Sequence, residues 1–158
     1  MINYTISVGN ENDTAAIAQF QVDMAQESEG TALDHELVLK GVAAAMADKY
    51  KGTYIVARVE GEAIGSLMLT REWSDWTNKW YWWIQSVYVK PEYRQQKYGS
   101  FILDHIEKDN INNVSRIQSE LLLFSDIGYD NLILFYEKNG YEYNIFNMIK
   151  QINKESQA

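Results

Sequence analysis

The stretch that decides the fold is VYVKPEYRQQKYGS, residues 87–100, which contains Pro91, the only proline of the chain. A β-branched and aromatic run ends at Val89, polar residues follow, and Gly99 opens an amphipathic segment. Because proline has no N–H for a sheet ladder, Pro91 predicts the end of a strand. A strand, a short turn and a helix N-terminus form an arrangement in which free backbone N–H groups converge on an anion. The stretch therefore indicates a phosphate-binding turn, and a solvated turn capped by glycine is the alternative.

The residues of this turn suit an anion in two ways. Arg94, Gln95, Gln96 and Lys97 offer amides and positive charge, and Gly99 is expected to let the backbone approach a phosphate without a Cβ. Two better-known phosphate motifs are excluded, because the chain has neither the G-x-x-x-x-G-K-[ST] nor the G-x-G-x-x-G pattern here.

Composition limits the class of protein and of partner. At 158 residues with 46% hydrophobic and 23% charged residues, the chain is most simply one globular domain. The net charge of −8 disfavours nucleic acid and favours a cationic small molecule. No apolar run is long enough to span a bilayer, and the first residues do not resemble a signal peptide, so we expect no membrane partner. The absence of cysteine fits a reducing compartment, and a cytoplasmic location is expected.

Hydrophobic periodicity predicts helices and strands that alternate along the chain, and hence a single α/β domain. The predicted strands share alternating or β-branched patterns and cover 4–10, 53–73 with a hairpin turn at Glu60-Gly61, 79–89, 119–124 and 141–152. The predicted helices share the i, i+3, i+4 pattern and cover 12–29 with Asn12 or Asp13 as cap, a segment from Asp34 to before Gly52, 99–108, and 130–140 with Gly140 as a left-handed cap. Gly30 separates the first two helices, and a polar tail begins at about 153.

Two of these segments resemble signatures of the GCN5-related N-acetyltransferases (GNAT family). VYVKPEYRQQKYGS resembles motif A, [QR]-x-x-G-x-[GA] after a strand that ends V-x-P, with Arg94 and Gly99 at its first and last positions. LFYEKNGYE, residues 134–142, resembles the later F-Y-x-x-x-G-[FY] signature. The predicted order of elements is similar to that fold along nearly the whole chain. The resemblance implies an acyl-CoA N-acyltransferase fold, with a mixed, mostly antiparallel central sheet flanked by helices.

The chain departs from the family pattern at two positions. Lys97 stands where motif A has its middle glycine, so either the lysine backbone is strained at positive φ or its ammonium contacts phosphate directly. Tyr129 stands where a helix-opening asparagine is common, and Asn131 is the candidate to replace it.

The resemblance also implies a cofactor and the residues that bind it. In this family an amine attacks the thioester of acetyl-CoA directly, a strand backbone pairs with the pantetheine arm and offers an N–H to the oxyanion, and the following turn holds the pyrophosphate. The residues so implied in this chain are Val87, Tyr88, Val89, Arg94, Gln95, Gln96, Lys97, Tyr98, Gly99, Ser100 and Asn131.

Candidates for the chemistry follow from the same resemblance. Tyr136 fills the tyrosine position of the later signature and is expected to protonate the leaving thiolate as a general acid, and a packing residue is the alternative. Glu27 is the candidate for the base or for an acceptor contact, against the alternative of a solvated surface glutamate. Trp83 and Gln85 are candidate substrate contacts on the strand, where glutamine itself cannot act as a base.

All five tryptophans fall between residues 73 and 83. Strand alternation places Trp80 and Trp82 on one face and Tyr81 and Trp83 on the other. Such aromatic walls suit a cationic acceptor, and they suit a core or a homodimer interface equally well. The two histidines, at 35 and 105, are too few and too far apart for a metal site, so no metal is expected.

The sequence thus predicts an acetyl-CoA-dependent N-acetyltransferase that acts on a small-molecule or peptidyl amine, which can be cationic. The alternative is a catalytically weak CoA sensor or an interaction module of the same fold.

Overall fold

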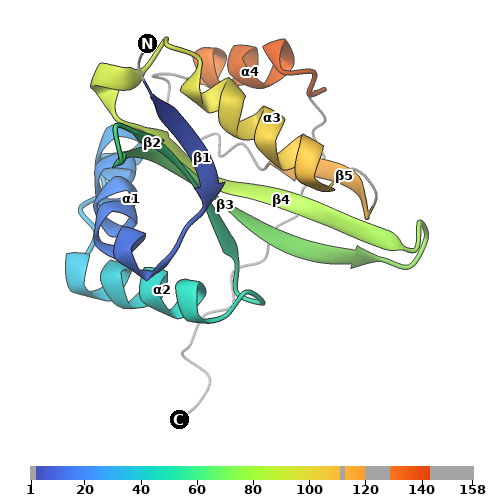
Figure 1. Cartoon of the computed structure of the whole chain (residues 1–158), viewed down its shortest axis with the longest axis horizontal. Helices are drawn as coiled ribbons and strands as arrows, with labels where there is room; N and C mark the ends of the chain where they lie inside the picture. Colours follow the sequence, from blue (N-terminus) through green and yellow to red (C-terminus); the bar gives the residue numbers. More distant parts are fainter. Residues whose placement is uncertain (1–2, 111–112, 120–128, 143–158) are drawn as a thin grey trace.

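The computed structural model of the chain describes residues 3–110, 113–119 and 129–142. Helices and strands alternate along it, as Figure 1 shows. The strands are β1 (Tyr4–Val8), β2 (Thr53–Val59), β3 (Glu62–Ser74), β4 (Lys79–Val89) and β5 (Val114–Ser119). The helices are η1 (Glu11–Asp13), α1 (Thr14–Glu29), α2 (His35–Ala47), η2 (Pro91–Tyr93), α3 (Tyr98–Asn110) and α4 (Tyr129–Lys138).

The described strands form one sheet in the order β1-β2-β3-β4-β5. The first four strands pair antiparallel, and β5 pairs parallel with β4. Helices α1 and α2 cover one face of the sheet, and α3 and α4 cover the other (Figure 1). The mixed, mostly antiparallel sheet flanked by helices is confirmed. None of the helices that the structure describes is long and apolar enough to cross a bilayer.

Each face of the sheet has its own hydrophobic core. On one face, Ile102 and Ile106, one helical turn apart in α3, pack against strand residues such as Leu67. On the other face, Phe20 of α1 and Val42 of α2 pack with strand residues. Because Pro91 ends β4 before α3 begins, the chain can cross from the sheet onto the helix layer at that point.

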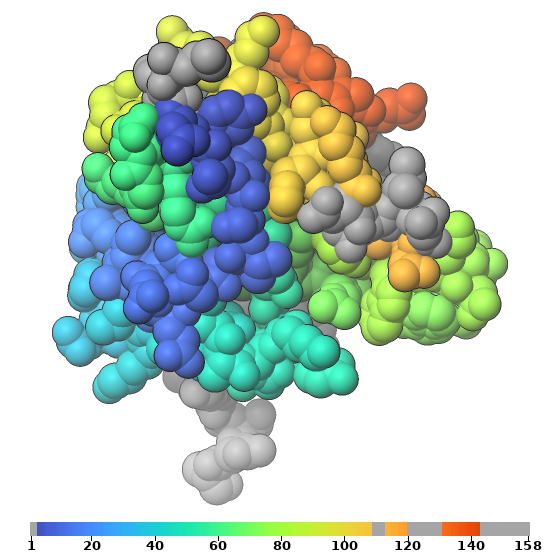
Figure 2. Space-filling view, viewed as in Figure 1, coloured from blue at the N-terminus to red at the C-terminus, as the bar shows by residue number. Residues whose placement is uncertain are grey.

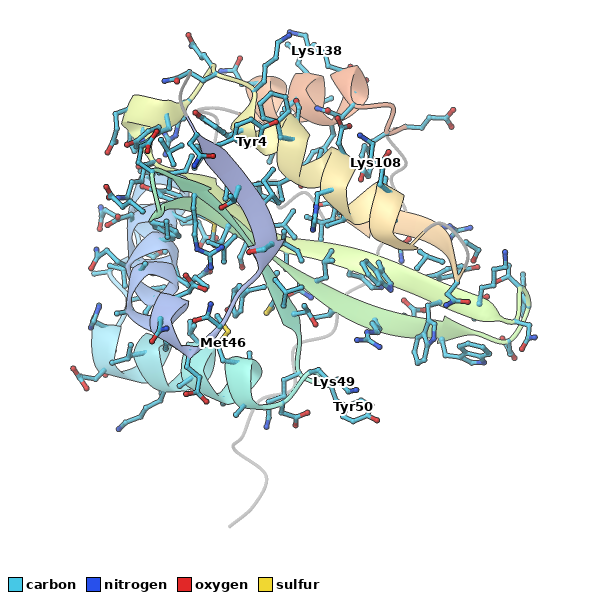
Figure 3. All side chains as sticks on the ribbon, in the orientation of Figure 1. Tyr4, Met46, Lys49, Tyr50, Lys108 and Lys138 are labelled. Carbon is cyan, nitrogen blue, oxygen red and sulfur yellow. The ribbon has the colours of Figure 1, made fainter. Side chains whose placement is uncertain are left out.

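Aromatic contacts fasten the edge strand β1 to α3. Tyr4 is labelled in Figure 3 on β1. Its ring stacks on Phe101 at 5.1 Å between centroids and meets Tyr98 edge-on at 6.0 Å. The start of α3, where the proposed anion turn lies, is therefore held from the β1 side as well as by the core.

The predicted turns are confirmed where the structure describes them. Glu60 and Gly61 have φ values of 49° and 85°, the left-handed pair that a two-residue hairpin between β2 and β3 requires. Gly30 ends α1 with a φ of 62°, and Gly140 follows α4 with a φ of 84°.

Of the two predicted caps, Asp13 stands at the N-cap position of α1, whereas Asn12 lies within the short helix η1. Asn10 caps the short helix η1, and its side chain accepts a hydrogen bond from the backbone N–H of Asn12 at 3.0 Å. Asp13 precedes α1 without a side-chain cap bond, because its carboxylate accepts from the Asn10 backbone N–H and pairs with Arg58 at 2.5 Å. A long-range ion pair with β2 thus uses the carboxylate that local sequence assigned to capping.

Two predicted strands need revision or lie outside the described residues. Of the strand predicted at 119–124, the structure describes only Ser119, which lies in β5; the described strand begins earlier than predicted, at Val114. The pattern VSRIQS has only two aliphatic residues, so the apolar run after it was the stronger signal. Of the predicted strand 141–152 and the tail from 153, the structure describes only residues 141 and 142.

The β3–β4 hairpin extends as an arm well beyond the body of the protein (Figure 1), and it carries the tryptophans. Trp82 packs against the core on the α3 side, whereas Trp73 is 50% and Trp76 94% exposed. Of the alternatives for the cluster, a core therefore does not describe Trp73 and Trp76, and a homodimer interface at the outer arm stays a prediction.

Gly65 sets the distance between β3 and β4 beside the predicted cofactor strand. It pairs with Val89, and a Cβ on it would lie 2.6 Å from the Tyr88 carbonyl oxygen. We expect Gly65→Ala to lower the free energy of unfolding by about 1–3 kcal/mol in urea denaturation, because the strands must move apart. The control is Gly41→Ala in α2, where a Cβ meets nothing within 4 Å. That variant should be neutral or stabilised, and a Gly65→Ala midpoint equal to wild type would contradict the packing argument.

Candidate functional site

Strand β4 is distorted where the predicted cofactor strand begins. Ser66 pairs with Tyr88 and Met68 with Gln85, so a single β3 residue faces two β4 residues and forms a β-bulge. Ser86 lies in this bulge with a φ of 55°, a left-handed conformation that serine rarely adopts. Bulges of this kind often lie beside active sites, because they re-aim backbone groups.

Among the described residues, β4 has no partner on its β5 side beyond the bulge. The last described pair of β4 with β5 is Ile84 with Ser119, and no described strand lies beside Val87 to Val89 on that side. An open strand edge presents backbone N–H and C=O groups that an extended ligand can pair with. The predicted strand for the pantetheine arm therefore has a free edge in the described part of the chain.

Tyr136 lies where this open edge starts. The Ser119 hydroxyl donates to the Ile84 carbonyl oxygen at 3.3 Å, and a side-chain hydrogen bond joins Ser119 to Tyr136. Burial raises the pKa of Tyr136 above its usual value, and the bond with Ser119 acts in the opposite direction. The phenol, only 6% exposed, is therefore protonated at neutral pH. Helix α4 and β5 together hold a proton donor beside β4.

The turn before α3 has the shape of an anion site. Gln95 and Lys97 have φ values of 63° and 69° on either side of Gln96, and α3 begins at the next residue. Left-handed residues at a helix start turn successive backbone N–H groups into one concavity. The first turn of α3 has no acidic residue, although the chain has 22. The residues present thus fit a diphosphate, held by backbone N–H groups and the Lys97 ammonium.

Of the two alternatives for Lys97, a strained backbone is the one observed. Its φ of 69° is left-handed, a conformation that is strained for lysine. We expect Lys97→Gly to raise the free energy of unfolding by about 1 kcal/mol, since glycine adopts this φ without the steric cost. Lys97→Ala removes the same ammonium and keeps the strain, so calorimetry on both variants separates backbone strain from phosphate contact. Gln96 has no positive φ, so Gln96→Gly should not raise the free energy of unfolding. A gain equal to that of Lys97→Gly would contradict backbone strain at Lys97.

The other side chains of the turn point in different directions. The Arg94 guanidinium donates from Nη2 to Glu27 Oε2 and from Nε to the Val89 carbonyl oxygen, each at 2.7 Å, and lies over the Tyr88 ring. The Gln96 amide donates to the Glu92 carbonyl oxygen at 3.0 Å. Arg94 is thus directed to α1 rather than into the turn.

Two motif residues have structural roles. A Cβ on Gly99 would lie 3.0 Å from the ring of Phe135, so this glycine lets α3 pack against α4. The expectation that Gly99 also serves the approach of phosphate stays a prediction. The Tyr98 side chain is buried in the core, and only its backbone can serve the turn, whereas Ser100 is half-buried and Asn131 is exposed near the start of α4.

Glu27 belongs to a polar cluster between α1 and β4. Its Oε1 accepts from the Tyr88 hydroxyl at 3.5 Å, while Oε2 accepts from Arg94. Burial, and then the negative charge of Glu27, raise the pKa of Tyr88 to about 12. The Tyr88 ring stacks on Phe20 at 5.3 Å, which holds it against α1. Glu27 is an exposed residue whose two carboxylate oxygens both contact groups of β4 and the following turn, and its role as base or acceptor contact stays a prediction.

Trp83 and Gln85 lie on the face of the sheet that packs against α1 and α2, opposite to the face that packs against α3. The Trp83 indole N–H donates to Glu72 Oε2 at 2.6 Å, and the Gln85 amide donates to Thr70 Oγ1 at 2.8 Å. The structure therefore places them with Glu27 on one side of the sheet, while Tyr136 lies on the other. Among the described residues no three His, Asp or Glu side chains are grouped to hold a metal.

Sequence reasoning missed Ser86, Ser119 and Glu72. A serine inside an otherwise apolar strand was the only sign of the bulge, and no sequence pattern links Ser119 to Tyr136.

The fold and the open strand edge define an acyltransferase-type protein, and comparison with known proteins shows the family. A family model described as "Acetyltransferase (GNAT) domain" matches residues 50–143, more than half of the chain. This protein belongs to the GNAT acetyltransferase family. No sequence match was found among curated proteins.

Solved structures agree with this assignment. A possible acetyltransferase from Clostridium difficile 630 is 30% identical, with a TM-score of 0.85 over 95% of this chain and 97% of that one. A ribosomal-protein-alanine N-acetyltransferase from Brucella melitensis biovar Abortus 2308 is 14% identical, with a TM-score of 0.76 over 96% of this chain and 100% of that one. An aminoglycoside acetyltransferase from an uncultured soil metagenomic sample is 11% identical, with a TM-score of 0.71 over 96% and 99%. The last two show likeness of fold alone.

Proposed function

We propose that this protein is an acetyl-CoA-dependent N-acetyltransferase acting on a primary amine. The observation that carries the proposal is the position of Tyr136, hydrogen-bonded to Ser119, which pairs with Ile84 of β4 just before the bulge. Acetyl-CoA supplies a thioester whose carbonyl carbon forms a bond to the amine nitrogen while its bond to sulfur breaks. The residues around the open edge supply binding, orientation and the proton.

The cofactor would be held in two places. Backbone groups of Val87 to Val89 would pair with the pantetheine arm, and the N-terminus of α3 with Lys97 and Ser100 would hold the diphosphate. A backbone N–H of this segment, re-aimed by the bulge at Ser86, would donate to the carbonyl oxygen, on which negative charge develops. Much of the rate would come from placing two reactants in one geometry.

Tyr136 would donate its proton to the departing thiolate. The raised pKa keeps the phenol protonated, and its burial keeps water from the leaving sulfur. The amine must lose a proton before it attacks, and Glu27 is the carboxylate proposed to accept it, directly or through water. Trp83 and Gln85 would contact the acceptor from the same side of the sheet as Glu27.

Glu27→Gln tests the proposed base. We expect turnover at pH 7 to fall about 100-fold, because the amine then stays protonated. The control is Asp23→Asn, a neighbouring carboxylate on α1 that also influences Tyr88. If Glu27→Gln changes cofactor affinity or stability but not turnover, Glu27 serves only to hold Arg94.

A catalytically weak CoA sensor or interaction module of the same fold is the second candidate. It is favoured by the strained Lys97 and by the pairing of Arg94 with Glu27, both of which can weaken a cofactor site.

One pair of measurements decides between the two. Thermal shift with acetyl-CoA measures cofactor binding, and thiol release across a panel of polyamines, aminoglycosides and peptide N-termini measures transfer. We expect both a rise in melting temperature and release with at least one amine. Binding without release from any amine would favour the sensor, and no binding would overturn both functions.

A further inference from the structure

A cavity lies away from the proposed cofactor site, on the face of the sheet that α3 covers. Its volume is about 440 Å³, within the range of small-molecule pockets. It is formed where the end of β1, the start of β2, the β3–β4 arm and the far half of α3 meet, and Figure 2 shows this face hollowed there. His105, on its wall, is seven residues from the start of α3, roughly 10 Å along the helix from the phosphate turn.

The walls of this cavity are aromatic. Trp80 and Trp82 line it from alternate positions of β4, as their shared face predicts. Trp73 pairs with Trp80 and meets its ring edge-on at 5.0 Å, which limits the freedom of that indole. Two indoles on one face of a rigid sheet offer flat surfaces against which a planar ring can stack.

The charge of the cavity is opposite to that of the chain. Arg71, paired directly with Trp82 across the sheet, lines it, and none of its described lining residues is acidic. The other three arginines are engaged: Arg58 with Asp13, Arg94 with Glu27, and Arg116 over the Tyr81 ring. Arg71 has no ion pair with any residue that the structure describes. A guanidinium in this position is suited to a carboxylate, which it can bind in a bidentate manner.

We propose that this cavity binds a planar aromatic carboxylate, with the ring between the arm tryptophans and α3 and the carboxylate on Arg71. The site is separate from the acetyl-transfer site, and it does not depend on the proposed function. Its ligand would bind with the cofactor site empty or filled.

Naphthalene-2-carboxylate is the probe, measured by calorimetry on the full chain without cofactor. We expect saturable binding at one site per chain, and at least tenfold weaker binding of naphthalene-2-carboxamide, which has the same rings without the charge. Arg71→Gln should weaken the carboxylate at least tenfold. Thr53→Phe, which fills the cavity from β2 without changing charge, should remove binding of both compounds.

Arg116→Gln is the matched control. It removes the same charge from β5, on the other side of β4 from Arg71, where the guanidinium lies over the ring of Tyr81. Its affinity for the probe should equal wild type. The proposal is overturned if no saturable binding occurs, if Arg116→Gln weakens binding as much as Arg71→Gln, or if CoA displaces the probe. Displacement by CoA would place the probe in the cofactor site. If the probe binds but the protein transfers no acetyl group, this proposal holds and the proposed function fails.

Discussion

Replacing Tyr136 with phenylalanine should lower turnover about 100-fold or more at pH 7 and leave the dissociation constant of acetyl-CoA nearly unchanged. The change removes one oxygen from a ring that stays buried, so the packing of α4 on α3 is retained. General acid catalysis by a positioned side chain raises the rate roughly 10²–10⁴-fold. This increase is lost when no group protonates the leaving thiolate. Initial rates of thiol release, together with calorimetry on acetyl-CoA, measure the two quantities separately.

The matched control is Tyr141→Phe. Tyr141 is a neighbouring tyrosine whose ring meets that of Tyr136 edge-on at 5.3 Å, so the variant also removes a phenolic oxygen from this cluster. Its turnover should stay within a few-fold of wild type. Equal turnover of Tyr136→Phe and wild type would return Tyr136 to the role of a packing residue, the alternative left open by the sequence.

The direction of the Tyr136 pKa shift also predicts the pH profile. Burial favours the neutral phenol, so the pKa lies above the usual value of about 10 and the acid form persists through pH 9. Turnover of the wild type should therefore not decline between pH 7 and 9 through loss of this proton. A decline with a midpoint near 8 that is absent from Tyr136→Phe would contradict the shift.

Ser100→Asp should raise the dissociation constant of CoA about tenfold to a hundredfold without loss of stability. The new carboxylate would lie in the first turn of α3, which has no acid at present, and would repel the diphosphate. The same carboxylate interacts favourably with the helix dipole, so the free energy of unfolding should be equal or slightly higher. Opposite signs for affinity and stability are difficult to explain by misfolding.

The control for Ser100→Asp is Ser115→Asp, which makes the same chemical change at an exposed position of β5 and gives the same net charge. Calorimetry should find its CoA affinity equal to wild type. If both variants weaken CoA alike, the effect comes from overall charge, and the diphosphate does not bind at the start of α3.

Much of the fold was predictable, because its signals are local. The hairpin at Glu60-Gly61 needs two residues at positive φ. The end of β4 at Val89 follows from Pro91, two residues later. The first helix and its left-handed end at Gly30 follow from apolar spacing and glycine. The start of β5 at Val114 was not predicted, because VSRIQS has a weaker apolar pattern than the run after it.

By itself, the sequence determined the family, the order of elements, the turn before α3 and the tyrosine at position 136, since these depend on neighbouring residues and short motifs. Only the tertiary structure decided that Arg94 pairs with Glu27, that Gly99 admits Phe135, and that Ser119 joins Tyr136 to Ile84 of β4. It also decided that Arg71 and the arm tryptophans line a cavity with α3. The partners in these contacts lie from 17 to 67 residues apart, and no local rule of spacing selects which of many equivalent side chains will meet.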